Sequence, residues 1–107
     1  MPIQILLLAG VVAPIVEETM FRGVLYRHLR EASMRFGKAL SVLVSGAVVS
    51  FVFAVIHPQG IFAVPVLMAL AFGFSLIREW RGTLLPCMVA HGLNNGLVTL
   101  TMILALR

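Results

Sequence analysis

The stretch from residue 39 to residue 77, ALSVLVSGAVVSFVFAVIHPQGIFAVPVLMALAFGFSLI, contains no Asp, Glu, Lys or Arg. A second stretch without these residues runs from 82 to 106. One membrane-crossing helix needs about 20 apolar residues, so each stretch is long enough for at least one. The 107-residue chain is 61% hydrophobic and 11% charged, with a mean hydropathy of +1.07. We therefore expect an all-α membrane protein, which excludes the classes of water-soluble enzymes.

Breaks in the apolar pattern divide the chain into four expected transmembrane helices, at residues 3–33, 39–57, 61–77 and 83–106. The first contains Pro14, and short links join the four as antiparallel neighbours. The apolar N-terminus lacks a basic segment before it, so we interpret it as the start of a mature helix and not as a signal peptide. Small residues at four-residue steps, such as Gly46, Gly73, Gly92 and Gly96, predict close helix contacts.

The basic residues indicate how the helices are oriented. The link around Gly37 is rich in Arg and Lys, residues 78–82 carry Arg78 and Arg81, and the turn at 58–60 carries none. Cytoplasmic loops are enriched in Lys and Arg, so we expect a multi-pass protein of the cell membrane with both basic links in the cytoplasm. This pattern accounts for the net charge of +4. It does not form one basic face, so we expect no nucleic acid partner.

Two adjacent acids lie inside the first expected helix. Ionisable groups in transmembrane helices are costly and usually mark functional sites. Glu18 and Arg22 are four residues apart, so they can form an ion pair. Glu17 lies about 100° around the helix and has no basic residue three or four positions later, which leaves its carboxylate available as a general base. The alternative is a polar clamp in which both glutamates hold helices together.

A histidine ends the second expected helix. His57 precedes Pro58, which disfavours helical geometry, and the helix dipole there favours a protonated ring. Alone, His57 could be a capping residue. If the first two helices fold back around Gly37, however, Glu17 and His57 are each twenty residues from the turn and reach a similar depth. We therefore expect this carboxylate and this imidazole to meet across the two helices.

The last expected helix carries His91 and Asn95 on one face, with Asn94 slightly to the side. Imidazole and amide groups can donate hydrogen bonds to a developing oxyanion. The alternative is polar bonding between helices, which is common in membranes. Cys87, the lone cysteine, lies one turn before His91, but a cysteine in an apolar helix is usually a small buried hydrophobe. A disulfide within the chain is excluded.

Three patterns resemble, in this order, the signatures of the CPBP family: E-E-T-M-F-R at 17–22, F-A-V-I-H at 53–57 and H-G-L-N-N at 91–95. This family comprises the type II CAAX prenyl endopeptidases and bacterial relatives, including lysostaphin-resistance and bacteriocin-immunity type proteins. The resemblance spans about residues 10–100. It implies an all-helical intramembrane protease in which a glutamate and a histidine activate water.

The resemblance also implies roles for individual residues. The implied catalytic residues are Glu17 as the general base, His57 as its partner on the water, and His91 with Asn95 as the oxyanion stabilisers. The implied supporting residues are Glu18 and Arg22, which orient the site, and Phe53, which packs beside it. The implied substrate is a prenylated CAAX tail or another membrane-associated protein or peptide. Because family members usually have further helices before the first motif, we expect residues 1–107 to form a single domain that lacks them.

Several alternatives remain beside a protease that needs no cofactor. Zinc held by Glu17, His57 and His91 would form a His₂Glu site, although no H-E-x-x-H helix is present. A catalytically silent immunity or scaffold protein could use the same network to lock the bundle. A proton relay through these residues is less favoured because no second acidic site exists. Four helices are few for enclosing a cavity in a lipid bilayer, so we also expect a homo-oligomer.

Overall fold

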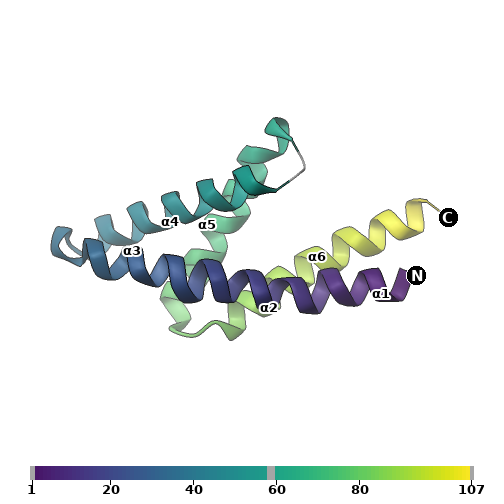
Figure 1. Cartoon of the computed structure of the whole chain (residues 1–107), viewed down its shortest axis with the longest axis horizontal. Helices are drawn as coiled ribbons and strands as arrows, with labels where there is room; N and C mark the ends of the chain where they lie inside the picture. Colours follow the sequence, from purple (N-terminus) through teal and green to yellow (C-terminus); the bar gives the residue numbers. More distant parts are fainter. Residues whose placement is uncertain (1, 58–59, 107) are drawn as a thin grey trace.

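The computed structural model of the chain describes residues 2–57 and 60–106 (Figure 1). This described part is almost entirely helical and contains no strand. It has four helices long and apolar enough to cross a membrane, at Ile3–Phe36, Lys38–Ile56, Ile61–Arg81 and Leu85–Ala105. The expected all-α membrane protein with four transmembrane helices is therefore confirmed.

The first helix is continuous but changes its winding along its length. Its segments are α1 (Pro2–Leu7), the π-helical η1 (Leu8–Val12), α2 (Ala13–Glu18), the π-helical η2 (Thr19–Leu25), α3 (Tyr26–Ser33) and the 3₁₀ turn η3 (Met34–Phe36). The remaining elements are α4 (Lys38–Ile56), the 3₁₀ turn η4 (Ile61–Ala63), α5 (Val64–Arg81) and α6 (Leu85–Ala105). π-Helical turns are rare and are frequent at functional sites. Here they flank α2, which carries both glutamates.

Pro14 accounts for the first π-helical segment. The Ala13 N–H donates to the carbonyl of Leu8, five residues back, and Pro14 has no N–H to donate. The carbonyl of Ala9 is thereby left without a donor from its own helix. Asn95 of α6 replaces that donor, because its Nδ2 lies 3.0 Å from the Ala9 oxygen. The proline thus leaves the helix intact and creates a docking point for α6.

The helices form two antiparallel pairings along the first helix (Figure 1). After a turn at Gly37, which has a positive φ of 94°, α4 runs back beside α3. α5 packs along α4, and α6 then packs beside the N-terminal part of the first helix. The start of α1 and the end of α6 consequently lie at the same end of the molecule (Figure 1). The polar residues of α2 lie between the two pairings.

The predicted end of the third transmembrane helix was wrong. α5 continues to Arg81, so Arg78, Glu79 and Trp80 belong to its last turns and not to the following loop. The charged residues interrupt the apolar pattern, whereas the helix itself ends at Gly82 in the left-handed conformation, with φ 75°. Of the predicted turn at 58–60, only Gly60 lies within the described residues.

Two of the predicted small-residue positions are tight contacts. A Cβ added to Gly92 would lie 2.5 Å from the carbonyl oxygen of Gly10 on the first helix, and one added to Gly46 would lie 2.8 Å from the ring of Phe72. In contrast, a Cβ at Gly73 or Gly96 would meet no atom within 4 Å. Close backbone packing of α6 therefore centres on Gly92, next to His91.

Candidate active site

Glu17 of α2 lies between two imidazole rings. Its Oε2 is 3.3 Å from Nε2 of His57, which follows α4, and its Oε1 is 3.5 Å from Nε2 of His91 on α6. The expectation that Glu17 and His57 meet across the first two transmembrane helices is therefore confirmed. The Glu17 side chain is 27% exposed, so the site is reachable from outside the bundle.

Glu18 differs from its neighbour because it is completely buried. Its Oε2 accepts from Nη1 of Arg22 at 2.9 Å and lies 2.7 Å from Nδ1 of His91. The predicted ion pair four residues apart is confirmed. The contact with His91, which is 73 residues away in sequence, was not predicted. Glu18 thus connects the ion pair of the first helix to the histidine of α6.

Arg22 ties this network to α5. The buried guanidinium donates from Nη2 to the Ala71 carbonyl and from Nε to Ser75 Oγ at 3.3 Å. It also lies 5.5 Å from the centre of the Phe53 ring and 5.4 Å from that of Phe74. A guanidinium in an apolar bundle needs such bonding to be stable. The chain of contacts from α5 through Arg22 and Glu18 holds the His91 ring in place.

Both histidines present the same nitrogen to Glu17. Nδ1 of His57 lies 2.5 Å from the Phe53 carbonyl, and Nδ1 of His91 lies against the Glu18 carboxylate. Both nitrogens of each ring face acceptors, and the Nδ1 contacts are shorter than the Nε2 contacts with Glu17. A neutral ring would therefore carry its proton on Nδ1 and direct its Nε2 lone pair toward Glu17. With both rings neutral, the three groups form a set of acceptors that can bind a proton, a water molecule or a cation.

A cavity of about 430 Å³ adjoins this cluster, mainly between α5 and α6. Its polar lining residues are His57, His91, Asn94, Asn95 and Thr99, and the rest of its wall is mostly apolar. Ligand sites commonly have this size and this mixture of apolar walls with a few polar groups. The cavity thus offers space for a peptide segment next to both histidines.

The two asparagines of α6 have different environments. Asn95 donates to the Ala9 carbonyl, which engages one of its two amide hydrogens. Asn94 lines the cavity and forms no side-chain hydrogen bond with the residues that the structure describes. The sequence analysis placed Asn94 only to the side of the site. It could not show that Asn95 is bonded to a carbonyl, because that carbonyl, of Ala9, is 86 residues away in the sequence.

Phe53 packs beside the site, as the resemblance implied. Its ring centre is 4.1 Å from that of His57 and 5.8 Å from that of His91. Cys87 is fully buried, and its thiol is directed at the Phe74 carbonyl, 3.1 Å away. The thiol is thus already bonded, which leaves it the buried packing role that the sequence favoured.

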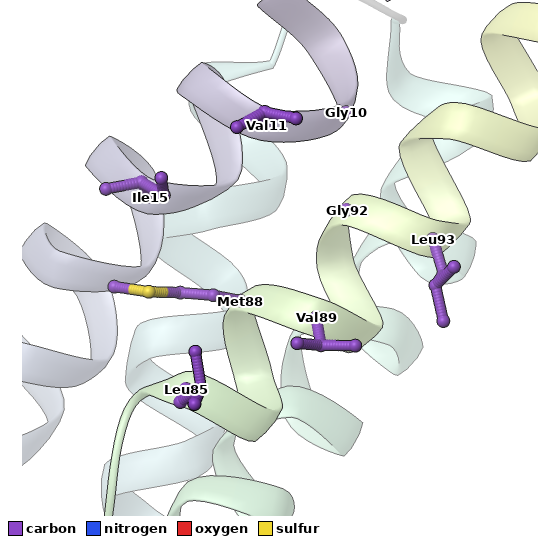
Figure 2. A pocket seen from close by; sticks show the side chains of 8 residues that line it. All are labelled: Gly10, Val11, Ile15, Leu85, Met88, Val89, Gly92 and Leu93. Carbon is purple, nitrogen blue, oxygen red and sulfur yellow. The ribbon is translucent and has the colours of Figure 1, made fainter. Parts of the chain in front are cut away.

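A second groove, of about 350 Å³, contains no polar side chain (Figure 2). It lies between the first helix and α6, and its lining residues are Gly10, Val11, Ile15, Leu85, Met88, Val89, Gly92 and Leu93 (Figure 2). Without donors, acceptors or titratable groups, this surface offers no catalytic chemistry. The polar cavity is the candidate active site.

Glu17, His57 and His91 are also the donor set that could hold a metal. Metal-ligating histidines usually donate their other ring N–H to a carbonyl or carboxylate, and both rings do so here. As the side chains stand, however, the described residues contain no group of three His, Cys, Asp or Glu side chains arranged to hold a metal ion. The donor types fit zinc, and the arrangement would have to close for zinc to bind.

The fold and the site define a multi-pass helical membrane protein with a carboxylate–imidazole cluster inside the bundle. The family described as Type II CAAX prenyl endopeptidase Rce1-like matches residues 1–97, and the chain belongs to this family. The membrane-embedded CAAX protease MroQ of Staphylococcus aureus (strain USA300) is 29% identical over 95 residues, which are 89% of this chain. The chain spans 38% of the length of MroQ. No solved structure matches the chain at a significant level.

Proposed function

We propose that this chain carries the active site of a glutamate-dependent intramembrane endopeptidase, which hydrolyses a peptide bond of a membrane-associated protein or peptide. The observation that carries the proposal is the Glu17 carboxylate between Nε2 of His57 and Nε2 of His91, beside a partly polar cavity. Membership in a family of CAAX endopeptidases supports protease chemistry at this cluster.

The proposed reaction begins with a water molecule that Glu17 and His57 bind together from one side, because their facing atoms are 3.3 Å apart. The water donates one hydrogen bond to the carboxylate and one to the Nε2 lone pair, which directs an oxygen lone pair at the substrate carbonyl carbon. Glu17 takes one proton as the C–O bond forms, and it returns this proton to the leaving nitrogen as the C–N bond breaks. A positioned general base typically contributes about 10²- to 10⁴-fold in rate.

The oxyanion is proposed to bind next to α6. His91 can donate from Nε2 only when its ring is protonated, because its Nδ1–H is directed at Glu18. The Glu18 carboxylate, held by Arg22, balances that positive charge. The free amide hydrogen of Asn95 is one further donor, and we add Asn94 as another because it lines the cavity with its amide unbonded by the described chain.

The proposed substrates are a prenylated CAAX-type tail or another membrane-associated protein or peptide. The cavity supports this choice because apolar residues of α5 and α6, among them Leu70, Val98 and Met102, form much of its wall. We place the basic ends of α3 and α5 on the cytoplasmic side of the cell membrane, as the positive-inside rule favours. The chain is proposed to work in a lipid bilayer, without nucleic acid and as a homo-oligomer.

Zinc-dependent hydrolysis is the second candidate, and one observation favours it. Both Nδ1 atoms are anchored by acceptors, which leaves two imidazole lone pairs and one carboxylate facing each other. Glu17, His57 and His91 would hold the metal, which would supply Lewis-acid activation of water. Metal analysis of purified protein, with cleavage measured after chelation, separates the candidates. Stoichiometric zinc with loss of cleavage on chelation would replace the metal-free mechanism.

The central experiment measures cleavage of a mixed peptide library that includes farnesylated CAAX peptides. Detergent-purified wild type, Glu17→Ala and Glu31→Ala are compared, and new termini are identified by mass spectrometry. Glu31 is a matched control because it is an exposed glutamate of the same helix, paired only with Arg27. We expect Glu17→Ala to abolish cleavage and Glu31→Ala to retain it. Wild-type turnover in Glu17→Ala would refute the general base.

The same experiment tests the non-enzymatic alternative. If folded wild-type protein cleaves nothing in the library, the result favours a catalytically silent immunity or scaffold protein over a protease. In that case, a protective phenotype that survives Glu17→Ala at normal protein levels would assign the polar network to holding the bundle together.

A further inference from the structure

A small cavity of about 190 Å³ lies at the basic end of the bundle, between α3 and α5. It shares no lining residue with the cavity of the proposed active site. Its charged lining residues are Arg27, Arg30, Glu31, Arg78 and Glu79. Three arginines and two glutamates therefore line one small cavity. What the cavity can bind depends on which of these side chains already have a partner of opposite charge.

Both carboxylates have cationic partners. Nε and Nη2 of Arg30 donate to the two oxygens of Glu79 at 2.6 and 2.9 Å, a bidentate pair. The Tyr26 hydroxyl adds a hydrogen bond to the same carboxylate at 3.0 Å. Arg27 and Glu31 pair at 3.1 Å one turn apart on α3. These contacts use the two acids and two of the three arginines.

Arg78 is the arginine that remains. It has no hydrogen bond or ion pair with the residues that the structure describes, and its Nε is buried without a partner. The Nε is enclosed, but the two terminal nitrogens of Arg78 are neither enclosed nor bonded within the described chain, so the charged guanidinium favours an anion that reaches these nitrogens from outside. The position of Arg78 in the wall of a cavity leaves room for such an anion.

We propose that this cavity binds a phosphate group through Arg78. The guanidinium fork matches phosphate oxygens in geometry and charge. The cavity is lined by residues near the ends of α3 and α5, and the exposed Trp80, a residue type enriched at membrane interfaces, follows the lining residue Glu79 in the sequence. Basic pockets between transmembrane helices at that level bind the headgroups of anionic lipids. The phosphate can come from such a headgroup or from free phosphate in solution.

The test compares wild type with Arg78→Gln and Arg81→Gln. Arg81 is the matched control because it is at the same end of α5 and carries the same charge, yet it does not line the cavity, and its guanidinium lies 5.3 Å from the Trp80 ring. Binding of short-chain phosphatidylglycerol, phosphatidylcholine and inorganic phosphate is measured by native mass spectrometry and by thermal unfolding in detergent. Circular dichroism and size-exclusion chromatography establish that each variant is folded.

We expect wild type and Arg81→Gln to bind phosphatidylglycerol in preference to phosphatidylcholine. We expect the affinity of Arg78→Gln for phosphatidylglycerol to be lower by a factor of roughly ten or more. Arg78→Lys, which keeps the charge but loses the fork, should fall between them and covers the case that Arg78→Gln does not fold. Equal protection by inorganic phosphate would support the site and assign it to soluble phosphate. Equal losses in Arg78→Gln and Arg81→Gln, or no preference for an anion, would overturn the proposal.

Discussion

Two neighbouring glutamates on one helix have opposite environments. Glu18 is completely buried, bonded to Arg22 and directed at Nδ1 of His91, so its charge is used to hold other side chains. Glu17 is partly exposed and faces the Nε2 atoms of His57 and His91. Two carboxylates in different surroundings can take different roles, as in several acid–base enzymes. This contrast supports an orienting role for Glu18 and a chemical role for Glu17.

Both asparagines of α6 are proposed oxyanion donors, but only Asn95 also forms a hydrogen bond with another helix. Asn95→Ala removes the donor to the Ala9 carbonyl, and we expect it to lower the free energy of unfolding by about 0.5 to 2 kcal/mol, as for other bonds between membrane helices. Asn94→Ala removes no internal bond, so we expect its unfolding temperature to stay near that of wild type. Its kcat should fall about 10²-fold if the amide binds the oxyanion.

Thermal unfolding in detergent and cleavage kinetics, measured on the same preparations, check this pair. A stability loss in Asn94→Ala with unchanged kcat would contradict the assignment of the two residues. Unchanged stability in Asn95→Ala would show that the Ala9 carbonyl finds another donor.

At the scale of elements, the first helix continues past Pro14 without a break. A proline inside a water-exposed helix costs about 3 kcal/mol or more, in part because a carbonyl loses its donor. In membranes, neighbouring helices can satisfy the freed backbone group, and α6 does so here through Asn95. The helical period and hydropathy predicted one helix over 3–33, but neither indicates a π-helical segment or the partner of its free carbonyl.

The close contact between α6 and the first helix predicts that adding one methyl group at Gly92 lowers both stability and cleavage. In Gly92→Ala the added Cβ would lie 2.5 Å from the Gly10 oxygen, so the two backbones must separate. Overpacking of this kind costs about 1 to 3 kcal/mol, and the movement also displaces the adjacent His91. We expect lower thermal stability and much weaker cleavage.

Gly96→Ala is the matched control for that change, since its Cβ would meet nothing within 4 Å. Its unfolding temperature and turnover should equal those of wild type. If both alanine variants behave alike, close backbone packing at Gly92 is not what positions α6.

At the scale of the whole molecule, little of the apolar surface is enclosed. The molecule extends 53 Å along its longest axis and only 16 Å along its shortest, so it is thin in one direction. Large apolar side chains, among them Ile61, Phe62, Leu93 and Leu97, are exposed. In a membrane these surfaces contact lipid or another chain. The cavity at the site therefore has walls on only some of its sides.

This thin shape leads us to expect self-association in the membrane. A second copy would cover exposed helix faces and help to exclude bulk lipid from the cavity. Chemical crosslinking in membranes, repeated after dilution with excess lipid, measures the oligomeric state. We expect dimers or larger species that persist on dilution and account for the cleavage activity. An exclusively monomeric active species would contradict this expectation.

The sequence by itself determined the membrane class, the number of helices, the Glu18–Arg22 pair and the similar depth of Glu17 and His57. Each of these depends on hydropathy, on the helical period or on counting residues from a turn, which are local properties. The end of α5 was predicted too early, because charged residues end an apolar run without ending a helix, and the left-handed Gly82 is what ends this one.

Only the tertiary structure decided which helix faces meet. It brought His91 to Glu18, assigned Asn95 to the Ala9 carbonyl, left Asn94 facing the cavity and left Arg78 without a partner. The helical period shows which residues share a face, but the rotation of one helix against another depends on packing between residues distant in sequence. Contacts such as Gly92 against Gly10 set that rotation, and with it the partner of each polar group.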